Sequence, residues 1–309
     1  MFQDEVLPVE ESERLHVACG KMADTVSESL QSYVWIVRHL YATYLASGKD
    51  THLVPALLLM EYAEPIDGVS ILARMGSARN CVVLIRSGFE LQLNLMYMLE
   101  RDDFYENRCL AYEFFHFQKQ LKVAVKCDPD SETGKQVRGQ IKGELLADAF
   151  EHPMRDIARE IKDAQALVNS PRYTGVKAEY ERTKSKLKHR LKHWYELWDG
   201  PKDLEHLARE LKRHGHYEVL YRYWSGDSHG ESALRRIRDG KGGALEMRPV
   251  RSPQGLPMAC LHACSFANEM TAFLVNRFLP SLREEMAARY LSRIKPGVEY
   301  IKAVRGLEG

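Results

Sequence analysis

The sequence predicts an all-α protein, a bundle of many helices, and two features indicate this class. Apolar residues recur at helical spacing over most of the chain, for example at Leu15, Met22 and Val26. Short clusters of glycine, proline and polar residues separate most of these periodic segments. Hydrophobic residues make up 45% of the chain and charged residues 28%, which is usual for a globular protein.

The first part of the chain predicts three helices. Residues 12–47 have the period of a long amphipathic helix. A second helical segment covers 51–75, and Pro65 within it predicts a kink or a break just before the proline. The third segment, 78–99, is apolar on nearly all sides, so we expect it at the centre of the bundle.

Turn and capping residues divide the middle of the chain. Asp102 or Asp103 is expected to cap a fourth helix that ends near residue 125. A turn follows, and Ser131 is expected to cap a weaker helix to about residue 150. Further helical patterns cover 152–169, 175–198 and 203–213.

The pattern changes after residue 231. Residues 231–256 predict either a small β-hairpin or a long ordered loop. Helical patterns return at 257–278 and 281–294. Because the chain has neither an internal repeat nor a low-complexity linker, we expect a single helical domain over 1–309, with an elaborated middle section at about 125–215.

Composition indicates a cytoplasmic protein without a membrane partner. The acidic start lacks the pattern of a signal peptide, and the most apolar window contains Arg86 and Glu90, which a bilayer would reject. The six cysteines lack the spacing of a zinc site, and Cys260 and Cys264 are expected to pack in the core. The usual phosphate-binding loops are missing from the sequence, so it predicts no cofactor and no metal site.

The segment 175–198 is rich in lysine and arginine and ends in Trp194, Tyr195 and Trp198. Such a helix can follow a nucleic-acid backbone and stack on its bases. Alternatively, it is an ordinary packing helix whose lysine side chains reach into solvent.

Polar residues form a stripe on the third predicted helix. Arg79, Arg86, Glu90, Asn94 and Tyr97 share one face, among strongly apolar neighbours. A buried charge must be paired, so one interpretation is a structural ion pair between Arg86 and Glu90. The other interpretation is the wall of a substrate pocket, which uses Arg79, Arg86 and Tyr97 for binding and Glu90 for catalysis.

A second candidate feature lies between Arg222 and His229. The arginine can hold a phosphate and the histidine can transfer a proton near neutral pH. Trp224 and Ser225 lie between them and are candidate substrate-binding residues. The alternative is structural, with Ser225 or a neighbour capping a helical turn and His229 merely exposed.

The Arg222-x6-His229 spacing resembles the motif of HEPN-type ribonucleases, which are small helical bundles of toxin and phage-defence systems. The resemblance implies metal-independent RNA cleavage, with Arg222 on the scissile phosphate and His229 moving the proton of the ribose 2′-hydroxyl. It also implies a homodimer that brings two such motifs together. Tyr223 departs from the pattern, because many of these motifs carry a polar residue directly after the arginine.

A broader resemblance covers about residues 30–290. Arg86-x3-Glu90, followed by Tyr221-x3-Ser225-x3-His229, is similar to the pattern of a bacterial helical family classed only as a domain of unknown function. It implies that Arg86, Glu90 and His229 share one site, and it supplies no reaction.

These features lead to two functional hypotheses. The first is a ribonuclease with a polar pocket in which His229, Arg222 and Glu90 are catalytic. The second is a non-catalytic helical module that binds a partner protein or a small anionic ligand.

Overall fold

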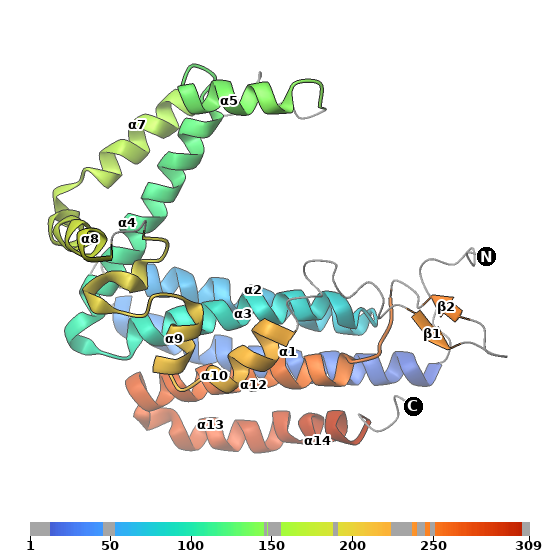
Figure 1. Cartoon of the computed structure of the whole chain (residues 1–309). Helices are drawn as coiled ribbons and strands as arrows, with labels where there is room; N and C mark the ends of the chain where they lie inside the picture. Colours follow the sequence, from blue (N-terminus) through green and yellow to red (C-terminus); the bar gives the residue numbers. More distant parts are fainter. Residues whose placement is uncertain are drawn as a thin grey trace. The chain divides into compact units, whose positions relative to one another are not determined.

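A computed structural model describes residues 13–45, 53–144, 147, 156–187, 191–223, 237–239, 245–247 and 251–304. The chain forms two compact units, one of residues 1–99 with 207–309 and one of residues 100–206. Both units are built from helices, so the all-α prediction is confirmed (Figure 1). That the whole chain behaves as one domain stays a prediction.

Four long helices make the centre of the first unit. They are α1 (Glu13–Leu45), α2 (Leu53–Arg74), α3 (Ala78–Leu99) and α12 (Leu256–Phe278). The pairs α1–α2, α2–α3, α1–α12 and α3–α12 pack side by side (Figure 1). Large side chains such as Tyr33, Phe89 and Phe266 are fully buried between them. Burying one large apolar side chain of this kind contributes on the order of 2 kcal/mol to the stability of the fold.

The predicted bounds of these four helices are confirmed within two residues, but the expected break at Pro65 is wrong. Helix α2 continues through the proline. The Pro65 ring is buried, and a Cβ atom at Gly88 of α3 would lie 3.5 Å from it. This distance is ordinary van der Waals contact, so the proline ring packs closely against α3, and this packing offsets the lost backbone hydrogen bond.

The C-terminal helices complete this unit. After η7 (Pro280–Leu282) come α13 (Arg283–Arg289), the π-helical η8 (Tyr290–Ile294) and α14 (Lys295–Val304). The predicted helix at 281–294 therefore extends to Val304. Helix α14 packs against α1 and α12, and Gly297 permits this approach because a Cβ atom there would overlap the Thr25 side chain.

The second unit contains α4 (Asp102–Cys127), α5 (Glu132–Ile141), α7 (Ile157–Val168), η2 (Pro171–Tyr173), α8 (Thr174–Leu187) and η3 (Trp194–Asp199). Ser131 caps α5 by accepting a hydrogen bond from the Gly134 N–H, as predicted, but α5 ends at Ile141 rather than near 150. The prediction that Asp102 or Asp103 caps α4 is wrong. The N-cap is Arg101, which makes no side-chain cap and instead donates to the Asp103 carboxylate.

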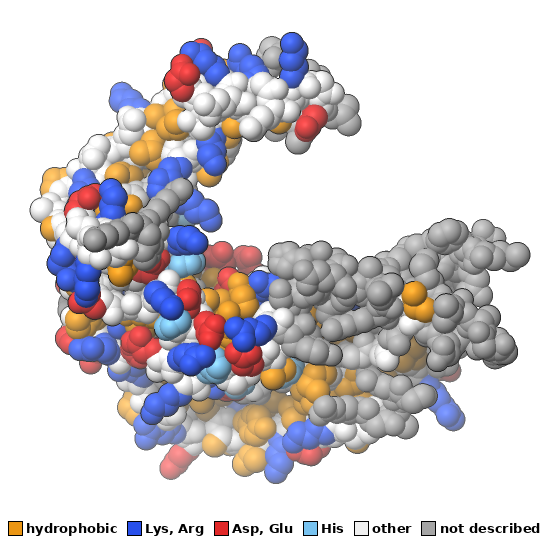
Figure 2. All heavy atoms as spheres, in the orientation of Figure 1, with side chains coloured by type: hydrophobic (Ala, Val, Ile, Leu, Met, Phe, Trp, Pro, Cys, Tyr) orange, Lys and Arg blue, Asp and Glu red, His pale blue; other side chains and the backbone are white. Residues whose placement is uncertain are grey.

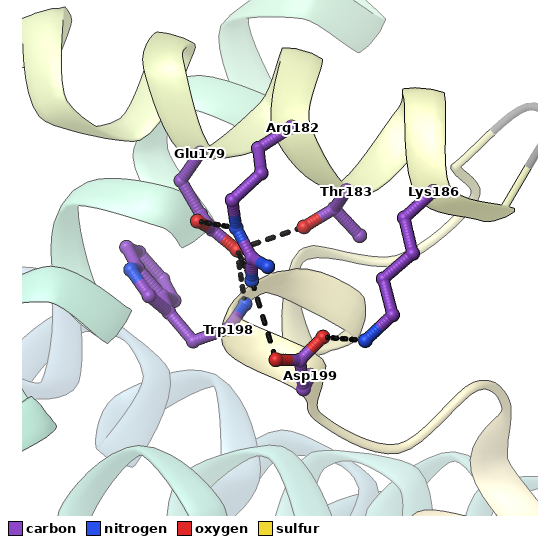
Figure 3. A network of polar contacts seen from close by, with 6 residues as sticks. All are labelled: Glu179, Arg182, Thr183, Lys186, Trp198 and Asp199. Carbon is purple, nitrogen blue, oxygen red and sulfur yellow. Dashed lines mark hydrogen bonds and ion pairs between the residues drawn. The ribbon is translucent and has the colours of Figure 1, made fainter.

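The predicted long helix at 175–198 is also wrong, because α8 ends at Leu187 and η3 follows as a separate turn. Trp198 and Asp199 adopt left-handed backbone conformations, with φ of 54° and 57°. A continuous helix cannot include such residues. Figure 3 shows the polar contacts that hold this turn against α8.

A short irregular region precedes α12. It contains α9 (Leu204–Glu210), α10 (His214–His216) and the π-helical η4 (Tyr217–Tyr223). Strands β1 (Ile237–Asp239) and β2 (Leu245–Met247) pair antiparallel, with Ile237 opposite Met247. These strands lie in the region for which the sequence predicted either a small β-hairpin or a long ordered loop. The five residues that join them lie outside the described residues.

Among the described helices, α12 is long and apolar enough to cross a membrane. Of its most apolar window, 56% is buried inside the protein, which is also the behaviour of a core helix. The predicted burial of Cys260 and Cys264 on this helix is confirmed.

Candidate functional site

Arg86 and Glu90 of α3 form the first part of the candidate site. They are one helical turn apart, and Arg86 Nε lies 3.8 Å from Glu90 Oε1. The Arg86 side chain is 17% exposed and that of Glu90 43%, so the pair lies at the edge of the core rather than inside it. Asn94, one turn further along, donates a hydrogen bond to the backbone carbonyl of Glu90.

Tyr221 of η4 joins this pair from a segment more than a hundred residues away in the sequence. The Arg86 guanidinium lies 3.9 Å from the centre of the Tyr221 ring. The Tyr221 hydroxyl donates a hydrogen bond to the Glu90 carboxylate. The motif on α3 and the segment that begins at Tyr221, which lie far apart along the chain, therefore meet in space.

Glu90 has an unusual electrostatic environment. Its burial raises the pKa of the carboxyl above the ordinary value, and the Arg86 charge and the Tyr221 hydrogen bond lower it only in part. A carboxyl group with a raised pKa beside an arginine is a common feature of catalytic and binding sites, although structural ion pairs show it as well.

A stack of flat groups continues from Arg86 along η4. The rings of Tyr221 and Tyr217 stack with their centres 5.1 Å apart, and the His214 ring stacks on Tyr217 at 6.2 Å. This Arg–Tyr–Tyr–His stack, Arg86–Tyr221–Tyr217–His214, gives the irregular π-helical segment a fixed geometry. π-Helical turns occur often at functional sites.

Arg222 lies next to Tyr221 but is held by another carboxylate. Its side chain is 60% exposed, and Nη1 lies 3.1 Å from Glu218 Oε2. The other Glu218 oxygen, Oε1, lies 3.2 Å from His214 Nε2. Sequence reasoning missed Glu218, although its position four residues before Arg222 in a helical segment is a recognisable pairing signal.

Two other predicted residues of α3, Arg79 and Tyr97, lie away from the Arg86–Glu90 pair. Arg79 and Tyr97 are each seven residues from Arg86 or Glu90, which is roughly 10 Å along the helix axis. Arg79 is half-buried in the first turn of α3 and Tyr97 is 5% exposed in the last. Trp224, Ser225 and His229 lie outside the described residues.

The basic residues of α8 do not form a free cationic surface. Lys177 contacts Asn169, Arg182 contacts Glu179 and Asp199, Lys184 contacts Glu181, and Lys186 contacts Asp199. These contacts favour the packing-helix interpretation of this segment over the nucleic-acid one.

Comparison with known proteins places the chain in a family. Residues 52–244 match the family of unknown function DUF5677, so the chain belongs to that family. The matched range includes all the predicted site residues, from Arg79 to His229. No curated protein and no solved structure matches the chain.

Proposed function

We propose that this protein is a metal-independent ribonuclease whose pocket contains Arg86, Glu90, Tyr221, Arg222 and His229. The observation that carries the proposal is the meeting of Arg86, Glu90 and Tyr221, because it joins α3 to the segment that leads directly into the Arg222–His229 motif. A purely structural Arg86–Glu90 pair would not require a third partner from η4.

Each residue has a role in this proposal. Arg222 binds the scissile phosphate once RNA displaces it from Glu218, since exposed ion pairs are worth only about 0–1 kcal/mol. His229 accepts the proton of the ribose 2′-hydroxyl. Arg86 and Glu90 fix the position of Tyr221 and so the geometry of η4. By its resemblance to HEPN-type ribonucleases, the protein would act as a toxin or in phage defence.

The test is cleavage of a mixed RNA by the purified protein in the presence of a chelator. We expect the wild type to cut and His229→Ala to lose at least a hundredfold in rate. His39→Ala is the matched control, because His39 is an exposed histidine on α1 that contacts the Trp35 carbonyl. Equal cleavage by His229→Ala and the wild type would contradict the proposal.

Self-association is the second part of the proposal. Helix α2 and the residue after it expose a row of large apolar side chains that share one face: Leu53 (61%), Leu57 (59%), Met60 (50%), Ile71 (58%) and Met75 (51%). Exposed apolar patches of this kind usually mark interaction surfaces. We infer that a second copy of the chain covers this face, which is what the ribonuclease resemblance implies.

The same face also supports the alternative, a non-catalytic module that binds a partner protein. A chain that sediments as a monomer and cuts no RNA would favour that alternative, since the exposed α2 face would then be left for a different protein.

A further inference from the structure

A second polar cluster lies in the same unit and centres on Glu269 of α12. Arg213 Nη1 lies 2.6 Å from Glu269 Oε2, and both side chains are 26% exposed. The Ser265 hydroxyl donates a hydrogen bond of 2.8 Å to Oε1. Both carboxylate oxygens are therefore held in place by groups on α12 and on the turn before α10. Figure 2 shows acidic, basic and histidine side chains gathered around α10.

His216 of α10 faces this carboxylate. Its Nε2 lies 3.9 Å from Glu269 Oε1. The imidazole stacks on Phe89, with ring centres 6.3 Å apart, and lies 6.2 Å from the Phe266 ring. Two aromatic rings and a fixed carboxylate therefore orient the imidazole. Distances of this length between a histidine and its orienting carboxylate are common in sites without substrate and shorten on binding.

Tyr62 of α2 adds a third group to the cluster. Its side chain is fully buried, and its hydroxyl has no hydrogen-bond partner among the described residues. Burial raises the pKa of this hydroxyl well above its ordinary value, and the charge of Glu269 raises it further. A buried hydroxyl without a partner costs about 1–3 kcal/mol.

The cluster adjoins the candidate site through two elements. Phe89, on which His216 stacks, directly precedes Glu90 on α3. His216 itself lies five residues before Tyr221, at the start of the segment that carries the Arg–Tyr–Tyr–His stack. The same two elements therefore position both the Glu90 pair and His216.

The proposed reaction needs a second proton-transfer group. When the 2′-oxygen attacks phosphorus, its proton passes to a base, and the new P–O2′ bond replaces the P–O5′ bond. The products are a 2′,3′-cyclic phosphate and a 5′-hydroxyl, so the leaving O5′ must receive a proton. No water or other reactant is consumed, and two positioned groups, one base and one acid, complete the balance.

We propose that His216, positioned by Glu269, is the general acid that protonates the leaving O5′ of the RNA. This inference rests on the proposed ribonuclease function. Glu269 acts as a positioning residue, because it holds the imidazolium in orientation while Arg213 and Ser265 hold Glu269.

The experiment compares two RNA dinucleotides, one ordinary and one in which sulfur replaces the bridging O5′. A thiolate leaves without protonation, so the second substrate does not need the acid. We expect His216→Gln to cleave the ordinary dinucleotide at least a hundredfold more slowly than the wild type and the sulfur analogue at nearly the wild-type rate. Glu269→Gln should show a smaller loss with the same rescue.

The controls separate this inference from the proposed function. His229→Ala, the base variant, should be slow on both substrates, and His39→Gln should match the wild type on both. Activity of His216→Gln on the sulfur analogue also reports that the variant is folded. Equal slowing on both substrates, or no slowing at all, would overturn the role of His216 while leaving the ribonuclease proposal intact. A wild type that cleaves neither substrate would overturn both.

Discussion

The Arg86 guanidinium contacts both the Glu90 carboxylate on its own helix and the Tyr221 ring on η4. A stacked arginine on an aromatic face is worth about 0.5–2 kcal/mol, depending on how far it is desolvated. The partly exposed ion pair with Glu90 adds about 0–1 kcal/mol. The contact with Tyr221 is therefore at least as important for placing η4 as the ion pair that the sequence suggested.

Arg86→Lys should weaken this contact while keeping the charge. Lysine lacks the flat guanidinium that stacks on Tyr221, so we expect a loss of about 1 kcal/mol in the free energy of unfolding by urea. Arg38→Lys, at an exposed arginine of α1, is the matched control and should change stability by less than about 0.5 kcal/mol. Equal losses in both variants would argue against a special contact at Arg86.

Glu90 predicts a pH dependence of stability. Its pKa is raised on folding by burial, so its contribution to stability is fully present below the ordinary carboxyl pKa and is lost as the pH rises through the folded value. Glutamine cannot ionise, so Glu90→Gln should gain stability relative to the wild type between about pH 4 and pH 7. Urea unfolding at several pH values measures this, and a difference that does not change with pH would refute it.

At the scale of elements, the sequence predicted most of the described long helices well and the irregular turns poorly. Helical periodicity and capping residues gave α1, α2, α3 and α12 close to their bounds. The turn after Leu187 could not be predicted in this way. It depends on contacts between residues that are distant along the chain, such as the hydrogen bond from the Trp198 N–H to Glu179.

The candidate site shows the same difference between contacts within one helix, which the sequence predicts, and contacts between distant segments, which it does not. The Arg86–Glu90 spacing was visible because both residues lie on one helix. Glu269 and His216 were not, since neither belongs to a recognisable motif and only packing of α10 against α12 brings them together. Arg79 and Tyr97 were included because they share a face with Arg86, but each lies about two helical turns from the Arg86–Glu90 pair, so a shared face does not bring them to it.

The turn at η3 depends on Glu179. Its carboxylate accepts hydrogen bonds from Arg182, Thr183 and the Trp198 N–H (Figure 3). Burial alone would raise the pKa of Glu179, but these donors lower it. The stabilising contribution is therefore present above the ordinary carboxyl pKa and is lost as the pH falls through the folded value.

Glu179→Gln should consequently destabilise the second unit. The left-handed residues Trp198 and Asp199 cost about 1–3 kcal/mol each and need this anchor. We expect a loss of about 2 kcal/mol at neutral pH, which shrinks as the pH falls, by thermal unfolding. Glu181→Gln, an exposed glutamate on the same helix that pairs with Lys184, is the control. A loss that persists unchanged in acid would contradict the anchoring role.

At the scale of the whole molecule, the exposed face of α2 predicts self-association. We expect the wild type to sediment as a dimer at micromolar concentration and Leu57→Glu with Ile71→Glu to sediment as a monomer. Because Glu61 and Glu64 are exposed on the same helix, added salt should strengthen the dimer by screening like charges.

Val123→Glu changes another exposed apolar residue, on α4, and serves as the control, which should remain dimeric. If the wild type is a monomer at all concentrations, the proposal that a second copy covers the exposed face of α2 is wrong.

The central claim is that the site joining α3 to η4 acts on RNA rather than only holding the fold together. The most direct measurement is RNA cleavage in chelator by the wild type beside the double variant Arg86→Met with Glu90→Leu. Replacing both members removes the ion pair and the stacking of Arg86 on Tyr221, so it should cost about 1–3 kcal/mol, which is less than the 5–15 kcal/mol that usually stabilises a domain. We predict a folded double variant that has lost cleavage at least a hundredfold. Cleavage by the double variant at the wild-type rate would contradict the claim and leave the Arg86–Glu90 pair a structural one.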